Sequence, residues 1–397
     1  MTSKTFCVAP FMGVEFRNNG QLTPCCRYTL PRSNSVWNFR EYDKWWNEYL
    51  TPMREELLNG IQHTGCKNCW RDEEIGIRSY RQNLNDDFIN YSSLTSPLPV
   101  PTYQMYNYGN FCNLKCVMCS PFASSQIETE YKQNIKQFNS IDVNYKLETE
   151  IKWFRSEEFE SIKNKLVGKA TQILIQGGEP FLSPDVLELL ASSKNQKDIS
   201  LTIISNLTTF TDEITELLKK FNKVNLVVSL EGIGIHNDYV RHGSNWNEIS
   251  ANIDKALCLP NIDFKIAHTF QRTSLIAFIP LLKWAMQKKL TVGSNILDYP
   301  NRLSVISATD SEKQTFLFEV DEFLKTIDNV KTDDNYYRFL LTCMKSDIEK
   351  IKNYVESTVY DAKCNQDFWN QIDLLDGLRN TDFTKVFDKI YRTQVAT

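Results

Sequence analysis

Apolar residues between positions 102 and 297 fall into six short runs, and polar segments with helical periodicity separate them. The runs cover residues 102–108, 172–175, 201–204, 224–230, 264–270 and 292–297. Short apolar runs that alternate with helices indicate parallel strands joined by right-handed crossovers. The pattern therefore predicts an α/β fold, built either as an open doubly wound sheet or as a full or partial barrel.

The helices expected between these strands follow from the spacing of their apolar positions. They cover residues 124–138, 149–166, 184 onward, 212–221, 246–257 and 275–288. Pro280 lies inside the last of them and predicts a late start or a kink there. In such folds the functional residues lie just beyond the C-terminal ends of the strands.

The alternation of strands and helices is confined to the middle of the chain. Residues 1–70 are rich in cysteine and irregular apart from a helix expected over 37–58. The charged segment 70–83 is interpreted as a solvated helix, and a proline-rich connection covers 92–101. Residues 310–397 are polar and mostly helical in pattern. We therefore predict an N-terminal module over 1–101, the strand-and-helix domain over 102–300 and a helical C-terminal extension over 301–397.

Composition narrows the functional classes. The 397 residues are 42% hydrophobic and carry 45 basic against 49 acidic side chains, a net charge of −4. This balance argues against a binder of polyanions such as nucleic acid. The sequence shows no membrane-spanning stretch and no N-terminal signal core, so we expect a cytoplasmic protein. Eleven cysteines in such a protein indicate metal or redox chemistry before disulfides.

Three cysteines stand close together directly after the first predicted strand. Cys112, Cys116 and Cys119 have the spacing C-x3-C-x2-C. Three soft thiolate ligands leave one iron of a four-iron cluster without a protein ligand. The alternative is a zinc loop, whose fourth ligand would have to come from elsewhere in the chain because the loop has no histidine.

Two further motifs lie at the ends of later strands. Residues 176–180 read Gln-Gly-Gly-Glu-Pro, and residues 229–232 read Ser-Leu-Glu-Gly, with Arg241 nine residues later. Together with the cysteine loop, these motifs resemble the radical S-adenosylmethionine (SAM) superfamily over about residues 102–300. The resemblance implies a partial (β/α)6 TIM-like barrel with a 4Fe-4S cluster that binds SAM. It also implies reductive cleavage of SAM to methionine and a 5′-deoxyadenosyl radical, which removes a hydrogen atom from the substrate.

The resemblance also implies roles for individual residues around SAM. Gly177, Gly178 and Glu179 would hold its amino group, and Arg241 would grip its carboxylate. Met118 stands where the family usually has an aromatic residue near the adenine, and Glu231 stands where it usually has aspartate. The remaining expected SAM contacts are Ser205, Asn206, Ser229 and Asn295. His236 is interpreted as a capping or packing residue.

A second set of cysteines precedes the predicted barrel. Cys7, Cys25, Cys66 and Cys69 resemble the ligands of the SPASM and twitch modules, which usually follow the barrel. The resemblance implies an auxiliary 4Fe-4S cluster with four protein ligands, a closed site suited to electron transfer. Cys26 is a spare or an alternative to Cys25, and a structural zinc knuckle is the alternative site. We interpret the scattered Cys258, Cys343 and Cys364 as small buried hydrophobic residues.

The function predicted from these motifs is an oxidative modification by a radical SAM enzyme assisted by the auxiliary cluster. The substrate would be a peptide side chain or a small metabolite, and the electron would come from a reductant protein such as flavodoxin or ferredoxin. Gln104, Tyr106 and Tyr108 alternate along the first strand and so share one face. If the barrel forms, several residues from this strand and from the ends of the other strands are expected to face its interior near the radical, and a packing or surface role is the alternative for each. The alternative function is a non-catalytic zinc-binding scaffold.

Overall fold

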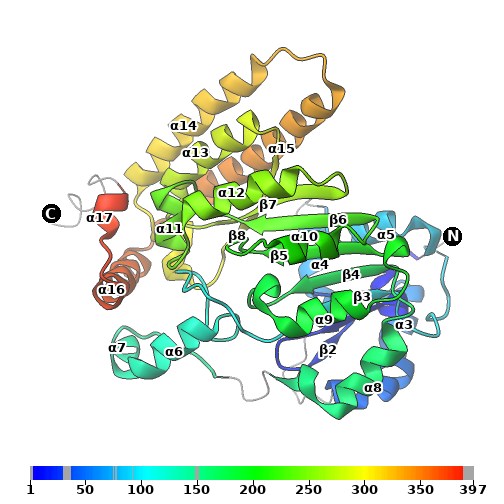
Figure 1. Ribbon diagram of the computed structural model, residues 1–397. Coiled ribbons are helices and arrows are strands. Elements are labelled where there is room, and N and C mark those ends of the chain that lie inside the picture. Colours follow the sequence, from blue (N-terminus) through cyan, green and yellow to red (C-terminus); the bar gives the residue numbers. More distant parts are fainter. Residues whose placement is uncertain are drawn as a thin grey trace. The chain divides into compact units, whose positions relative to one another are not determined.

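The described strands form one mostly parallel eight-stranded sheet. The computed structural model describes residues 3–29, 37–74, 76, 78–91, 93–147 and 152–387. The strand order is β2-β1-β3-β4-β5-β6-β7-β8 (Figure 1). The bounds are Gly13–Phe16 (β1), Leu22–Thr23 (β2), Tyr103–Asn107 (β3), Gln172–Gln176 (β4), Ser200–Ser205 (β5), Lys223–Ser229 (β6), Ile262–Phe270 (β7) and Thr291–Ile296 (β8).

The six predicted strands are confirmed as β3 to β8, and two more come from the N-terminal region. β1 pairs with β3 in parallel, with Val14 opposite Gln104, and with β2 in antiparallel. The cysteine-rich N-terminal region therefore shares a sheet with the first predicted strand. Closure into a barrel and the three-domain division stay predictions.

Most predicted helices lie close to where the periodicity places them, with two exceptions described below. The helix expected over 124–138 is divided into two at Asn134, and the helices over residues 9–12 and 235–240 were not predicted. The bounds of the helices are Ala9–Met12 (α1), Tyr42–Lys44 (α2), Thr51–Leu58 (α3), Lys67–Glu74 (α4), Tyr80–Asp87 (α5), Ser125–Gln133 (α6), Ile135–Ser140 (α7), Glu157–Leu166 (α8), Pro184–Ser192 (α9), Asp212–Leu218 (α10), Ile235–Val240 (α11), Trp246–Leu257 (α12), Ser274–Gln287 (α13), Asp310–Asp328 (α14), Asn335–Ser357 (α15), Ala362–Arg379 (α16) and Phe383–Val386 (α17).

The first exception is the helix predicted over 37–58, which is broken into a 3-10 turn, α2, a π-helical stretch over Trp45–Tyr49, and α3. The second is the helix predicted over 149–166. It begins at Glu157, because the Ser156 side chain caps it by accepting the Phe159 N–H at 3.2 Å. Residues 148–151 lie outside the described residues. Pro280 is accommodated inside α13.

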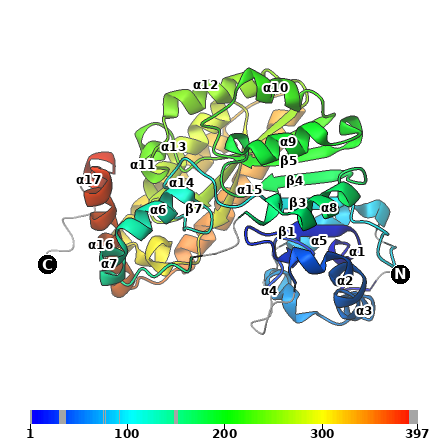
Figure 2. The same cartoon turned by 60° about the horizontal axis from the view of Figure 1, so that its bottom comes forward.

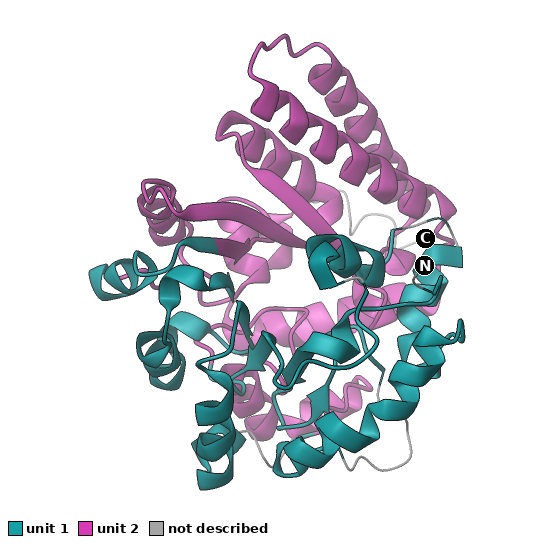
Figure 3. Ribbon diagram, turned by 90° about the vertical axis from the view of Figure 1, so that its right-hand side faces the viewer, with its two compact units in different colours: residues 1–111, 147–204, 212–224 teal, residues 112–146, 205–211, 225–397 magenta. Residues whose placement is uncertain are grey.

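The chain forms two compact units (Figure 3). The first comprises residues 1–111, 147–204 and 212–224, and the second comprises 112–146, 205–211 and 225–397. Figure 2 shows α1 to α5 gathered around β1 in the first unit. None of the described helices has the length and apolar character that crossing a membrane requires.

An aromatic cluster forms the core of the first unit beside β3. The ring of Phe16 stacks on Tyr106 at 5.3 Å and on Trp153 at 5.5 Å, and Tyr108 lies against Phe154. Gln104 donates to the carbonyl of Leu166 at the end of α8. Gln104, Tyr106 and Tyr108 therefore share a face, as predicted, and that face packs on residues 153–166. This packing role is the alternative that the sequence left open for them.

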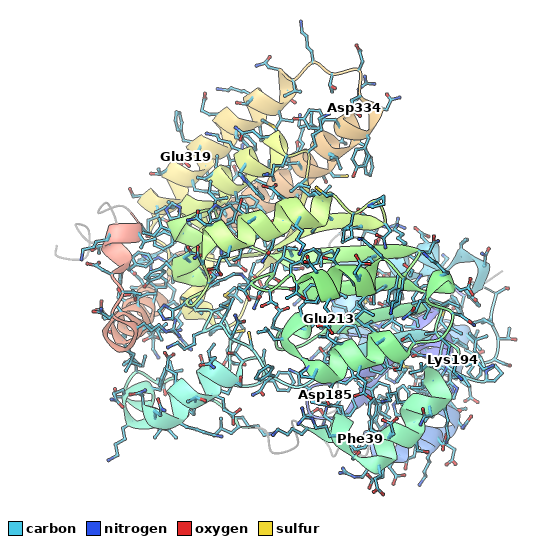
Figure 4. All side chains as sticks on the ribbon, in the orientation of Figure 1. Phe39, Asp185, Lys194, Glu213, Glu319 and Asp334 are labelled. Carbon is cyan, nitrogen blue, oxygen red and sulfur yellow. The ribbon has the colours of Figure 1, made fainter. Side chains whose placement is uncertain are left out.

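Helix α15 covers the edge strand β8 in the second unit. The Ser294 N–H donates to the Asp347 carboxylate at 3.1 Å, and Lys350 Nζ donates to the Ser294 carbonyl at 2.9 Å. The Asp334 side chain caps the start of α15, and Glu319 lies on the neighbouring helix α14. Both residues are labelled in Figure 4. Asp347 and Lys350, one helical turn apart, thus form hydrogen bonds with backbone groups of β8 to which another strand could otherwise pair.

Candidate iron–sulfur and SAM site

The three cysteines of the C-x3-C-x2-C loop gather in the second unit. Cys112 and Cys116 are buried with Leu114, and Met118 and Cys119 pack against them. Ser124 Oγ donates to the Leu114 carbonyl at 2.6 Å, which folds the loop back before α6 begins. The structure thus brings together the three predicted ligands of the SAM-binding cluster.

The thiols of the loop influence each other electrostatically. A hydrogen bond with Cys119 lowers the pKa of Cys116 to about 7 despite its burial, and the positive charge of Arg241 also lowers it. The same hydrogen bond and then burial raise the pKa of Cys119 well above its usual value. The hydrogen bond from Cys119 and the charge of Arg241 thus favour the thiolate form of Cys116, which is the form that binds a metal.

Arg241 lies against the loop and is held by Glu231. Its Nη1 is 3.8 Å from the Cys116 sulfur, and its Nη2 donates to Glu231 Oε1 at 3.0 Å. Its Nε is buried and has no hydrogen-bond partner among the described residues. Burial alone would lower the pKa of Arg241, but Cys116 and Glu231 raise it, so the guanidinium stays charged. An orphaned N–H on a charged side chain that also contacts the Cys116 sulfur fits a site for an anionic group such as the SAM carboxylate.

The Gly-Gly-Glu-Pro motif forms a tight turn after β4 in the first unit. A Cβ at Gly178 would lie 2.3 Å from the Phe111 carbonyl oxygen, and both Gly177 and Gly178 have positive φ. The Glu179 N–H donates to that same carbonyl at 2.8 Å. The turn therefore contacts the residue that directly precedes Cys112 in the sequence.

The Ser205–Asn206 turn at the end of β5 lies beside the loop. Asn206 Nδ2 donates to Asn113 Oδ1 at 3.1 Å and is 3.9 Å from the Cys112 sulfur. Ser205 Oγ accepts the Leu207 N–H. Ser229 is half-buried at the end of β6, and Asn295 is exposed on β8. The described contacts thus bring Asn206, but not Asn295, to the cysteine loop.

Two histidines of the second unit, His268 and His236, are packing residues. His268 is fully buried, with Nδ1 2.9 Å from the Leu230 carbonyl and Nε2 2.9 Å from Ser274 Oγ. His236 packs its ring against Phe387, as predicted.

A second cysteine cluster lies in the first unit. Cys7, Cys25, Cys66 and Cys69 line one enclosed cavity together with Tyr80 and Arg81. Cys26 is exposed and is not among the lining residues. The cavity thus brings together the four predicted auxiliary ligands, and it favours Cys25 over Cys26.

Burial raises the pKa of all four cavity thiols. The pKa of Cys7 is about 12, and those of Cys25, Cys66 and Cys69 are also raised. A metal ion or cluster that binds there must therefore displace protons from neutral thiols. Among the described residues, no three or more His, Cys, Asp and Glu side chains are already arranged as ligands of one metal ion.

Sequence reasoning missed the residues that surround these cysteines. Arg81 lines the N-terminal cavity and forms a bidentate pair with Glu73, with contacts of 2.9 and 2.7 Å. Its position follows from the fold of α4 and α5, and no spacing in the sequence signals it. The prediction for the scattered cysteines was wrong, because Cys258 is exposed and Cys343 and Cys364 are only half-buried.

Comparison with solved structures gives weak similarities. Native anSMEcpe with bound AdoMet is 17% identical, and the match covers 56% of this chain and 60% of that one, with a TM-score of 0.39. Streptococcus suis SuiB bound to its precursor peptide SuiA is 13% identical over 80% and 70% of the two chains, with a TM-score of 0.38. These scores are too low to establish a shared overall fold. No curated protein matches.

The family comparison covers the cysteine loop and the motifs that follow it. The model of the Radical SAM superfamily matches residues 106–257. This segment contains Cys112, the Gly-Gly-Glu-Pro turn and Arg241. Residues 106–257 therefore carry the sequence features of the Radical SAM superfamily, whose members are enzymes that use SAM and a 4Fe-4S cluster.

Proposed function

We propose that this chain is a radical SAM enzyme that carries out an oxidative modification of a peptide side chain or a small metabolite. The observation that carries the proposal is the gathering of Cys112, Cys116 and Cys119 next to Arg241, whose Nη1 lies 3.8 Å from the Cys116 sulfur and whose buried Nε has no partner among the described residues. Three thiolates suit a four-iron cluster with one open iron, and the charged N–H suits an anionic ligand beside it. When bound, the cluster and SAM would supply a 5′-deoxyadenosyl radical that abstracts a substrate hydrogen atom.

The residues of the chain would hold and orient SAM in this proposal. Arg241 takes its carboxylate, and the turn of Gly177, Gly178 and Glu179 takes its amino group. Asn206, which contacts the loop through Asn113, would orient the ribose side with Ser205 and Ser229. Met118 and Asn295 are the proposed adenine contacts.

The N-terminal cavity is the proposed site of the auxiliary 4Fe-4S cluster. Its support is that Cys7, Cys25, Cys66 and Cys69 line one enclosed space. Four protein ligands close the coordination of the cluster, so the site suits electron transfer and not substrate chelation. After a hydrogen atom has been removed from the substrate, the auxiliary cluster would accept one electron from the substrate radical, which completes a two-electron oxidation. A flavodoxin or ferredoxin would reduce the SAM-binding cluster.

Iron counting tests this assignment. Anaerobically reconstituted protein should hold about eight irons per chain, as two four-iron clusters. Replacing Cys112, Cys116 and Cys119 together with alanine should leave about four, because only the N-terminal site then remains. A colourless protein that binds zinc at both sites would contradict the proposal and support the scaffold alternative.

The role of the auxiliary cluster has its own test. A Cys66→Ala/Cys69→Ala variant should still cleave SAM, because the three-cysteine loop is intact, but it should not form the oxidised product. Undiminished product formation would contradict electron transfer and leave the N-terminal site a structural role.

A further inference from the structure

Arg241 and Cys116 are held opposite each other by the backbone. The Lys115 N–H donates to the His242 carbonyl at 2.9 Å, and the Val117 N–H donates to the Val240 carbonyl at 2.8 Å. Cys116 and Arg241 are the residues between these two hydrogen bonds. This pairing explains why Nη1 lies 3.8 Å from the Cys116 sulfur, and it fixes where the arginine side chain starts.

Glu231 holds the guanidinium group at the far end of the Arg241 side chain. Its Oε1 accepts Nη2 of Arg241 at 3.0 Å, and its Oε2 accepts the Thr269 N–H at 2.9 Å. The backbone N–H of Glu231 donates to Asn237 Oδ1 at 3.1 Å. Both carboxylate oxygens are therefore occupied by the chain itself, and the residue is only 1% exposed.

The Nε–H of the guanidinium has no hydrogen-bond acceptor among the described residues. Arg241 is only 8% exposed. Buried N–H groups of charged side chains nearly always have an acceptor. The missing acceptor points to a ligand atom at this N–H.

We propose that Glu231 is a positioning residue, which orients Arg241 so that Nη1 faces the Cys116 sulfur and Nε faces the SAM carboxylate. This inference rests on the proposed function and refines it, because Glu231 then acts on SAM only through Arg241. Glutamate in place of the usual aspartate supplies the extra length that lets one carboxylate bridge Arg241 and the Thr269 backbone.

Electron paramagnetic resonance (EPR) of the reduced SAM-binding cluster tests the inference, because SAM bound near the cluster perturbs its spectrum. The reconstituted full chain is titrated with SAM. In Glu231→Gln we expect wild-type iron content and a half-saturating SAM concentration about tenfold higher, equivalent to about 1.4 kcal/mol. Arg241→Lys should show a similar increase, because lysine keeps the charge but loses the fork of N–H groups.

A double-mutant cycle separates action through Arg241 from direct contact. In an Arg241→Gln background, Glu231→Gln should cause no further loss of SAM affinity, because the two residues act as one unit. Independent, additive losses would overturn the inference and indicate that Glu231 contacts SAM itself.

The matched control is a second buried arginine–glutamate pair in the same unit. Arg272 Nη2 donates to Glu312 Oε1 at 2.9 Å, and both side chains are buried. Glu312→Gln should lower stability as Glu231→Gln does, yet leave the SAM titration unchanged. A shift in this control equal to that of Glu231→Gln would overturn the inference, because general destabilisation would then explain both.

The test also distinguishes this inference from the proposed function. If wild-type protein shows no SAM-dependent change in its EPR spectrum, the proposed function fails and the inference fails with it. If wild-type protein responds to SAM and Glu231→Gln responds at the same concentration, only the inference is overturned.

Discussion

Single residues in this protein are fixed by contacts that leave little freedom for substitution, and Gly178 is the clearest case. A methyl group there would lie 2.3 Å from the Phe111 carbonyl oxygen, and the residue has a φ of +54°. Gly178→Ala should therefore destabilise the fold by about 1–3 kcal/mol, through backbone strain and the displaced Phe111.

Thermal or denaturant unfolding measures this loss, and Gly377→Ala is the control. Gly377 lies inside α16, and no atom lies within 4 Å of the position that a Cβ would take there. Alanine should therefore stabilise that helix by about 0.5–1 kcal/mol. Equal effects of the two variants would contradict the close approach at the Gly-Gly-Glu-Pro turn.

The neighbouring Cys25 and Cys26 give a matched pair of substitutions. Only Cys25 lines the N-terminal cavity, whereas Cys26 is exposed. Cys25→Ala should therefore lower the iron content from about eight to about four per chain, and Cys26→Ala should keep about eight. The reverse result would make Cys26 the ligand.

At the scale of elements, an ion-pair network attaches helix α16 to helix α6. Arg379 Nη2 is 2.7 Å from Glu130 Oε2, and Lys115 Nζ is 2.8 Å from Glu130 Oε1. Burial would raise the pKa of Glu130, but Arg379 and then Lys115 outweigh it, and the pKa is lowered. A carboxylate with a lowered pKa stabilises the fold above its unfolded-state pKa and loses that contribution as the pH falls through its folded-state pKa.

Unfolding measured across the acid range should show this dependence, and Arg379→Leu should reduce it. Lys219→Leu is the control, because it removes an ion pair with Glu216 in which both side chains are largely exposed. The same acid profile in wild type and Arg379→Leu would contradict a contribution from this network.

Strands and helices could be predicted from the sequence where the burial of apolar side chains determines their positions. Strands β3 to β8 are apolar because the interior of a parallel sheet is covered on its faces, and each was predicted close to its observed bounds. β1 and β2 were not predicted, because they are short and Glu15 interrupts the apolar run of β1. The late start of α8 was readable in Ser156, followed by Glu157 and Glu158, a typical N-terminal helix signal.

The side chains around the candidate site were less predictable than the ligands themselves. The cysteine spacing and the glycine pair are local signals, because one loop or one turn carries all the residues concerned. The bridge from Glu231 to Arg241 and Thr269 depends on how β6, β7 and α11 pack, which no local pattern encodes. The covering of β8 by Asp347 and Lys350 depends in the same way on the packing of α15.

At the scale of the whole molecule, each compact unit contains one set of gathered cysteines. The first unit holds Cys7, Cys25, Cys66 and Cys69 around a cavity, and the second holds Cys112, Cys116 and Cys119 beside Arg241. Two separate sulfur sites suit a reaction that needs both a source of radicals and an electron acceptor. The proposed function depends on the site in the second unit, because without radical formation the auxiliary site has no electron to accept.

Formation of 5′-deoxyadenosine is the most direct measurement of radical chemistry at that site. Anaerobically reconstituted wild-type protein is mixed with SAM and a strong reductant, and the nucleoside is quantified chromatographically. We expect 5′-deoxyadenosine from wild type and none from the variant with Cys112, Cys116 and Cys119 replaced by alanine. No 5′-deoxyadenosine from iron-loaded wild-type protein, or equal amounts from both proteins, would contradict the proposed function.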